Sequence, residues 1–78
     1  MKEQETKIET FRSHLLDRIQ EDRISSITYD SEGRRYFQAI PKVGEYSWVF
    51  DLALREGVMA NTGPYTTAIT ITEEKTDD

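Results

Sequence analysis

His14 is the only histidine in the chain, and it is therefore the first residue to consider for acid–base chemistry. Histidine is the most common general acid or base in enzymes, and Asp17 follows three residues later, where a helix would place the carboxylate about one turn away. This spacing would allow Asp17 to orient His14 as a general base. The same spacing is common on exposed helix surfaces, and no nucleophile motif accompanies it. We therefore interpret His14 as a solvent-facing helical residue.

The rest of the sequence offers no assembled set of reactive groups. Cysteine is absent, which excludes disulfides, thiolate metal ligands and thiol nucleophiles. The glycines are isolated from one another, so no phosphate-binding loop can be drawn. Neighbouring carboxylates such as Glu21 and Asp22 point apart on any regular element. We predict a protein that is not an enzyme, with no catalytic, cofactor-binding or metal-binding residues and no small-molecule substrate.

Aromatic residues raise a second chemical possibility. Tyr36, Phe37 and Trp48, with basic side chains nearby in the sequence, would suit a sheet that stacks single-stranded nucleic acid. The chain has a net charge of −5, however, and no cluster of Lys and Arg marks a phosphate-binding surface. We expect these aromatics to form core, so nucleic-acid binding is an alternative hypothesis and nucleic acid is not the expected partner.

Most of the excess negative charge lies at the C-terminal end. Residues 58–78 contain one Lys against four Asp or Glu, and all five of these residues fall within 73–78. We therefore predict one domain over residues 1–72, followed by an acidic, disordered tail over residues 73–78. An acidic inhibitor that occupies the basic surface of a nucleic-acid-processing protein is a second alternative hypothesis.

Neither a targeting signal nor a membrane span is expected. The first residues are polar, and the longest uncharged run, Val58 to Thr72, is rich in Thr and contains Gly and Pro. These features predict an intracellular, cytoplasmic protein without a membrane partner.

The elements that must position these residues begin with an amphipathic helix. Its expected range is 6–22, with a capping box formed by Thr6 and Glu9. Its apolar residues recur at helical spacing, which predicts that they form one buried stripe: Ile8, Phe11, Leu15, Leu16 and Ile19.

Two strands should follow the helix as a hairpin. The segments 24–29 and 35–40 are rich in β-branched and aromatic residues, and they flank Asp30-Ser31-Glu32-Gly33. Gly33 can adopt the left-handed backbone conformation that a short hairpin loop often requires.

The segment from Glu45 to Leu54 fits two structures. As a strand, it places Tyr46, Trp48 and Leu54 on one face, whereas its Leu-Ala-Leu-Arg-Glu run favours a helix. The alternation favours the strand. A last strand is expected over 65–72, after the turn at Asn61-Thr62-Gly63-Pro64.

The predicted fold class is α+β, with an N-terminal amphipathic helix on one face of a small antiparallel sheet. The preferred order is an α-β-β-β-β meander, and α-β-β-α-β is the alternative.

The last two predicted strands provide the candidate interaction surface. Soluble sheets usually protect exposed faces and edges with charged side chains, and only one residue of the outward set is charged. We therefore expect a non-catalytic interaction module, a homodimer that binds a second copy or another protein through this face or the edge from Tyr65 to Thr72. The predicted surface residues are Ser47, Val49, Asp51, Ala53, Thr66, Ala68, Thr70 and Thr72.

Overall fold

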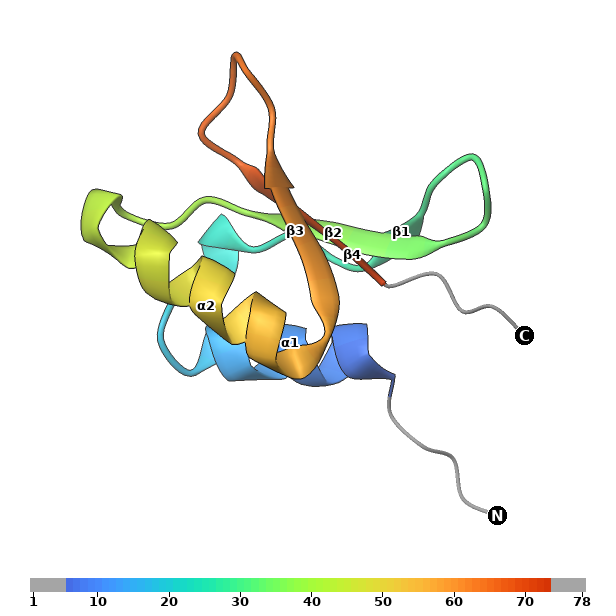
Figure 1. Cartoon of the computed structure of the whole chain (residues 1–78), viewed down its shortest axis with the longest axis horizontal. Coiled ribbons are helices and arrows are strands. Elements are labelled where there is room, and N and C mark those ends of the chain that lie inside the picture. Colours follow the sequence, from blue (N-terminus) through green and yellow to red (C-terminus); the bar gives the residue numbers. More distant parts are fainter. Residues whose placement is uncertain (1–5, 74–78) are drawn as a thin grey trace.

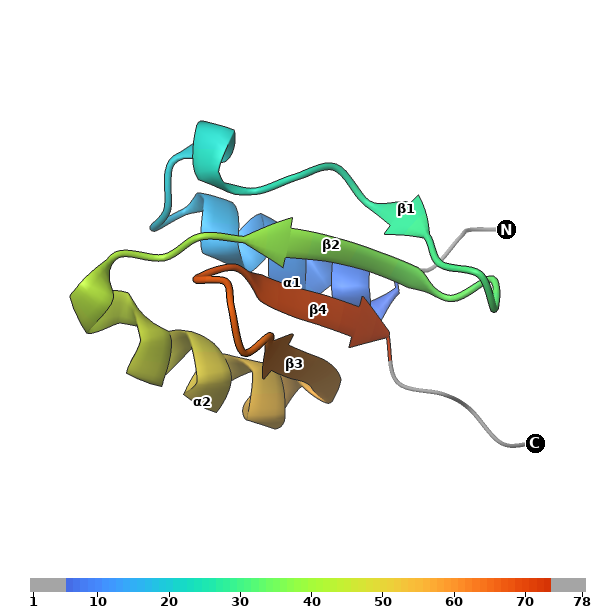
Figure 2. The same ribbon diagram turned by 90° about the horizontal axis from the view of Figure 1, so that it is seen from above.

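The computed structural model describes residues 6–73, which form two layers (Figure 1, Figure 2): a four-stranded antiparallel sheet and two helices on one of its faces. The predicted α+β class, with the N-terminal helix packed on an antiparallel sheet, is confirmed. Short 3₁₀ turns, η1 and η2, precede β1 and α2. The elements in chain order are α1 (Lys7–Leu16), η1 (Glu21–Arg23), β1 (Thr28–Tyr29), β2 (Arg35–Ala39), η2 (Val43–Glu45), α2 (Tyr46–Glu56), β3 (Val58–Thr62) and β4 (Ile69–Glu73).

Helix α1 begins where its capping signal predicts. The Thr6 hydroxyl accepts a hydrogen bond from the Glu9 amide, and the Glu9 carboxylate accepts one from the Thr6 amide, each at 3.2 Å. The helix ends at Leu16, earlier than predicted, and the chain turns before η1. Ile19 lies beyond the helix and is still buried. Neither helix within residues 6–73 is long and apolar enough to cross a membrane.

The predicted β1–β2 hairpin is present, although β1 is limited to Thr28–Tyr29 and is shorter than the predicted strand over 24–29. Gly33 has a φ of 83°, and the Asp30 carboxylate accepts hydrogen bonds from the amides of Glu32 and Arg34 at 2.9 Å each. These bonds close the loop, because a short Asx turn satisfies amides that no strand partner reaches.

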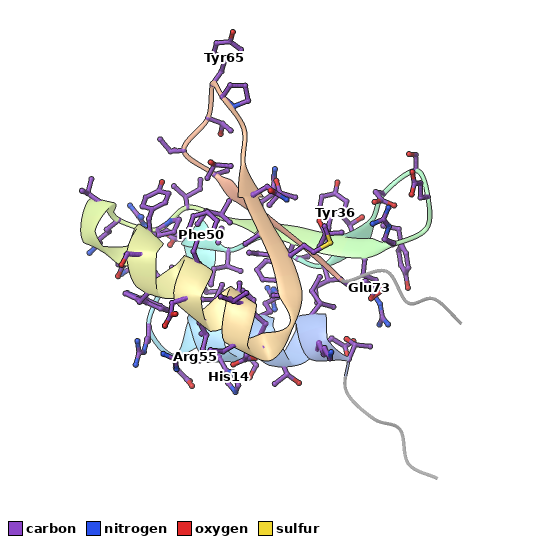
Figure 3. All side chains as sticks on the ribbon, viewed as in Figure 1. His14, Tyr36, Phe50, Arg55, Tyr65 and Glu73 are labelled. Atoms are coloured by element: carbon purple, nitrogen blue, oxygen red, sulfur yellow. The ribbon has the colours of Figure 1, made fainter. Side chains whose placement is uncertain are left out.

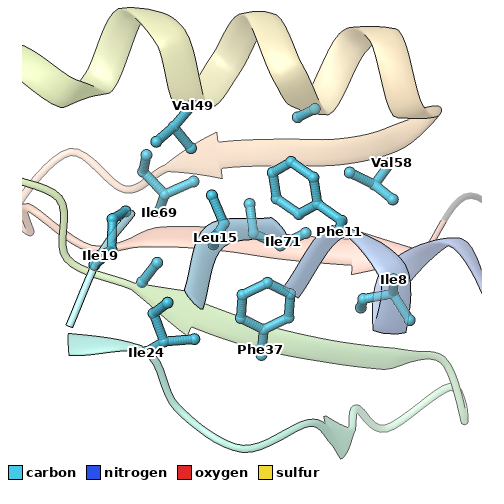
Figure 4. Packing of buried hydrophobic residues seen from close by; sticks show 12 residues of the cluster. Ile8, Phe11, Leu15, Ile19, Ile24, Phe37, Val49, Val58, Ile69 and Ile71 are labelled. Atoms are coloured by element: carbon cyan, nitrogen blue, oxygen red, sulfur yellow. The ribbon is translucent and has the colours of Figure 1, made fainter. Parts of the chain in front are cut away.

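The sheet order is β1-β2-β4-β3, and the strand register divides the side chains between two faces. The face toward the helices carries Phe37 from β2 together with Ile69 and Ile71 from β4, all fully buried. Side chains from both helices pack against them (Figure 4). The complete buried core consists of Ile8, Phe11, Leu15, Ile19, Ile24, Phe37, Ala39, Val49, Ala53, Val58, Ile69 and Ile71.

The predicted strand over 45–54 is wrong, because this segment forms helix α2. Val49 and Ala53, one helical turn apart, are buried, whereas Leu54 is 80 % exposed. Gly57 ends the helix with a φ of 76°, and its amide bonds to the carbonyls of Ala53 and Leu54. The helical alternative was therefore correct here, although the full order is α-β-β-α-β-β, which neither prediction contained.

The predictions for the C-terminal part also need correction. β3 was not predicted: its last two residues, Asn61 and Thr62, were assigned to a turn and residues 58–60 to no element, and the strand pairs with β4 from Val58↔Glu73 to Thr62↔Ile69. β4 lies between β2 and β3, so it is not an edge strand. Glu73, assigned to the tail, is the last residue of β4. The remainder of that predicted tail lies outside the described residues.

Replacing Gly57 with alanine should lower the free energy of unfolding by about 1–2 kcal/mol, because a left-handed backbone costs that much once a Cβ is present. Urea unfolding followed by circular dichroism measures the change. Gly44→Ala is the matched control, since Gly44 has no positive φ and open space around a Cβ. Equal effects at the two positions would contradict the proposed importance of the left-handed cap.

Candidate functional site

The structure does not bring the eight predicted surface residues together. Val49 and Ala53 are buried under the sheet, because the helical period turns both toward the core. Ser47 and Asp51 are exposed on the opposite side of α2. Thr66 and Ala68 lie in the β3–β4 loop. Of the eight, only the β4 residues Thr70 and Thr72 lie within a strand on the sheet face turned away from the helices.

That open face nevertheless has the property that motivated the prediction. The register places its side chains in two cross-strand rows, Thr28–Tyr36–Thr72–Met59 and Gln38–Thr70–Asn61. None of these seven residues carries a charge, although charged residues make up 32 % of the chain. All seven are partly or fully exposed. We call the set Thr28, Tyr36, Gln38, Met59, Asn61, Thr70 and Thr72 the neutral face.

Neither helix covers the neutral face. Figure 1 shows both helices on the opposite side of the sheet, Figure 2 shows α1 behind β2 and β4, and Figure 3 shows Tyr36 on the side away from His14. The Gln38 amide donates a hydrogen bond to the Thr70 hydroxyl at 3.4 Å, while Met59 is 42 % exposed. A patch that combines short hydroxyl and amide side chains with a thioether and an aromatic ring suits contact with another protein surface.

Charged residues gather at one end of the sheet, where they pair with one another. Arg35 contacts Glu73 at 3.2 Å and Glu9 at 3.6 Å. Arg34 bonds to Glu32 at 2.6 Å, and this hydrogen bond raises the pKa of Arg34 above its ordinary value. The positive charges of Arg34 and Arg35 are therefore paired with carboxylates. These ion pairs lie beside the neutral face and do not belong to it.

A groove of about 330 Å³ runs between the two helices on the other side of the molecule. His14 contacts Glu56 at 2.5 Å, so its partner is a residue of α2 and not Asp17. Arg18 lies 4.7 Å above the ring of Trp48, and Arg55 pairs with Asp51 at 2.6 Å. The first contact joins α1 to α2, the second joins the segment after α1 to α2, and the third lies within α2. No hydroxyl, thiol or amine side chain lines the groove among the described residues.

The aromatics considered for nucleic-acid stacking do not share a surface. Tyr36 belongs to the neutral face, Phe37 is fully buried, and Trp48 lies beneath Arg18 on the helical side. A stacking platform built from these three side chains is therefore not present in the fold.

No family model, curated protein or solved structure matches the chain. Within residues 6–73, no group of three or more His, Asp or Glu side chains is arranged to hold a metal ion.

Sequence reasoning missed five members of the neutral face: Thr28, Tyr36, Gln38, Met59 and Asn61. A usable signal was present in the uncharged run from Val58 to Thr72, which corresponds to β3, the loop and most of β4. β3 itself was missed because Asn61, Thr62, Gly63 and Pro64 together resemble a turn.

Proposed function

We propose that this chain is a non-catalytic protein-interaction module that forms a homodimer through the neutral face. The observation that carries the proposal is an exposed sheet face without a charged side chain, in a chain where charged residues are abundant. An unprotected face of this kind is typical of a surface that another protein covers.

A second copy is the occupant that the charge distribution favours. Each copy has a net charge of −5, so two copies repel one another wherever their charged surfaces approach. The neutral face removes this repulsion from the contact itself. Two sheets that meet face to face pack about 10 Å apart with interleaved side chains, and Thr, Gln and Tyr can satisfy their polar groups across such a contact. A basic partner would instead favour the acidic parts of the surface.

The two alternative hypotheses gain no support from a specific contact. The acidic side chains at the sheet end are neutralised by Arg34 and Arg35, which weakens the case for an acidic inhibitor that uses this region. The dispersed aromatics give no support to a nucleic-acid-binding sheet.

Two lysines on the neutral face should strongly weaken the dimer. The double variant Gln38→Lys/Thr70→Lys places adjacent positive charges where the two copies meet. An unpaired buried charge costs roughly 3–5 kcal/mol, so we expect dimerisation to weaken by at least about 100-fold. Size-exclusion chromatography with light scattering over a concentration series measures the change.

The matched control is Ser13→Lys/Ser47→Lys, which adds the same charge to exposed positions on the two helices. This control should dimerise like the wild type or slightly better, because it reduces the net negative charge. A wild-type chain that is monomeric throughout the series would refute the homodimer, and equal weakening by both double variants would refute the neutral face as its contact surface.

A further inference from the structure

The loop between β3 and β4, residues 63–68, projects above the neutral face. Figure 1 shows it rising on the side of the sheet opposite the helices, and Tyr65 marks its tip in Figure 3. Tyr65 is 97 % exposed. We call residues 63–68 the arm. A fully exposed tyrosine at the end of a projecting loop is unusual in a soluble domain, since Tyr favours positions that bury its ring.

Contacts within the molecule hold the arm in place. The Ala68 amide donates a hydrogen bond to the Thr66 hydroxyl at 3.0 Å. The Tyr46 hydroxyl of α2 donates one to the Thr67 carbonyl at 2.5 Å. A Cβ on Gly63 would lie 3.0 Å from the Thr66 methyl group, so the loop is closely packed at its base. Such ordering lowers the entropy that Tyr65 would lose on binding.

A hollow lies at the end of the sheet from which the arm projects. It has a volume of about 180 Å³, and its lining combines the charged residues Asp22 and Arg23 with Ile24, Ser25, Gln38, Ile40 and Ala68. Ile40 is 45 % exposed, which leaves apolar surface open to solvent. The hollow can hold several water molecules, and displacing them with an aromatic ring would cover its apolar wall.

The neutral face alone is small for a stable dimer. Four strands about 4.8 Å apart, with up to five residues of about 3.4 Å each, cover roughly 300 Å². Side chains make the accessible surface larger than this flat area. Even twice the flat area stays below the roughly 800 Å² per partner of a standard interface. A buried Tyr side chain adds about 150–250 Å², so two exchanged arms would supply much of the difference.

The sheet order makes this exchange geometrically possible. A two-fold axis parallel to the strands, between β2 and β4, places the arm-bearing ends of the two sheets at the same end of the dimer. It also reverses the strand order of one sheet relative to the other. The β3–β4 side of one copy then faces the β1–β2 side of the other. Ile40 follows β2 directly at this same end, since Ala39 and Thr62 are both register partners of Ile69. The arm of each copy therefore meets the hollow of its partner.

We propose that, in the homodimer, Tyr65 of each copy inserts into the Ile40–Ala68 hollow of the other copy. This inference rests on the proposed self-association and specifies its symmetry and its anchor residue. Large aromatic side chains in a pocket commonly contribute a major share of interface energy, whereas the surrounding contacts mainly exclude water.

Cysteine cross-linking tests the contact directly, because the chain contains no cysteine. We mix a Tyr65→Cys chain with an Ile40→Cys chain, oxidise the mixture and separate the products without reductant. A mixed disulfide should form in preference to either disulfide between identical chains, since residue 65 of one copy faces residue 40 of the other and both are cysteine only in the mixed pair. The second Tyr65–hollow contact of that pair remains intact. Leu54→Cys, at an exposed position on α2, replaces Ile40→Cys in the control and should give no preferred mixed product.

Solution measurements on Tyr65 variants complete the test. Tyr65→Ala should weaken dimerisation by at least tenfold, while Tyr65→Phe should stay within a few-fold of the wild type; circular dichroism checks that each variant is folded. A dimer that Gln38→Lys/Thr70→Lys disrupts, but that neither needs Tyr65 nor gives the mixed disulfide, would overturn the arm exchange and leave the proposed function in place. A monomeric wild type would overturn both.

Discussion

Replacing Phe37 with alanine removes about 3–5 kcal/mol from the free energy of unfolding, the cost expected for truncating a fully buried Phe. A domain of 78 residues has a total stability of roughly 4–12 kcal/mol, so this single change consumes much or all of it. Phe37 projects from β2 toward α1, where its ring centre lies 6.3 Å from that of Phe11. The cavity left by truncation therefore opens at the contact between the two layers.

Urea unfolding at a fixed protein concentration measures this loss, because self-association adds stability that depends on concentration. Tyr29→Ala serves as the control, since Tyr29 is 65 % exposed and its truncation should change stability by no more than about 0.5 kcal/mol. A loss below 1 kcal/mol at Phe37 would show that the sheet and helix layers are not packed as the structure has them.

The parts of the fold that the sequence predicted correctly depend on short-range signals. The Thr6–Glu9 capping box lies within four consecutive residues, and the β1–β2 hairpin is determined by the loop that ends in Gly33. The alternation of Ile69 and Ile71 with Thr70 and Thr72 was also read correctly, because one face of β4 is buried and the other is not. Each of these features can be judged without knowing what lies elsewhere in the chain.

The segment from Tyr46 to Glu56 was predicted wrongly because two periods fit it. Apolar and polar residues alternate there, yet the residues one helical turn apart also form an apolar stripe. Gly57 distinguishes the helix from the strand, since a glycine directly after a Leu-Ala-Leu-Arg-Glu run is typical of a helix C-terminus. The helix then supplies Val49 and Ala53 to the core, a packing arrangement that local alternation could not reveal.

The sequence predicted a weakly charged sheet surface, but it did not predict which residues form the uncharged face of the structure. The alternation in the two predicted strands, 46–54 and 65–72, indicated an outward face with Asp51 as its one charged residue, whereas the structure places an uncharged, uncovered face across all four strands of the sheet. Its members Tyr36 and Gln38 join through the pairing of β2 with β4, which are separated by α2 and β3 in the chain. A long-range pairing of this kind has no signature within either strand. The His14–Glu56 contact was missed for the same reason, since 42 residues separate its partners.

Aspartate substitutions in α2 distinguish the helix from the strand that alternation favours. In the helix, Val49 is fully buried and Leu54 is 80 % exposed, whereas the strand would turn Leu54 inward and Val49 outward. Val49→Asp should therefore lower the free energy of unfolding by more than about 3 kcal/mol, because it buries a carboxylate without a partner. Leu54→Asp should cost less than about 1 kcal/mol, mainly from the weak helix propensity of Asp and its position near the helix C-terminus.

Urea unfolding measures the stability of both variants. Each variant serves as the control for the other, because both carry the same added charge at positions only five residues apart. The reverse order of stabilities would mean that this segment is a strand. The neutral face as defined above would then not exist, because β3 reaches the sheet edge only if the chain passes through α2 and turns at Gly57. The stability of two α2 variants thus tests the same structural feature on which the proposed dimer depends.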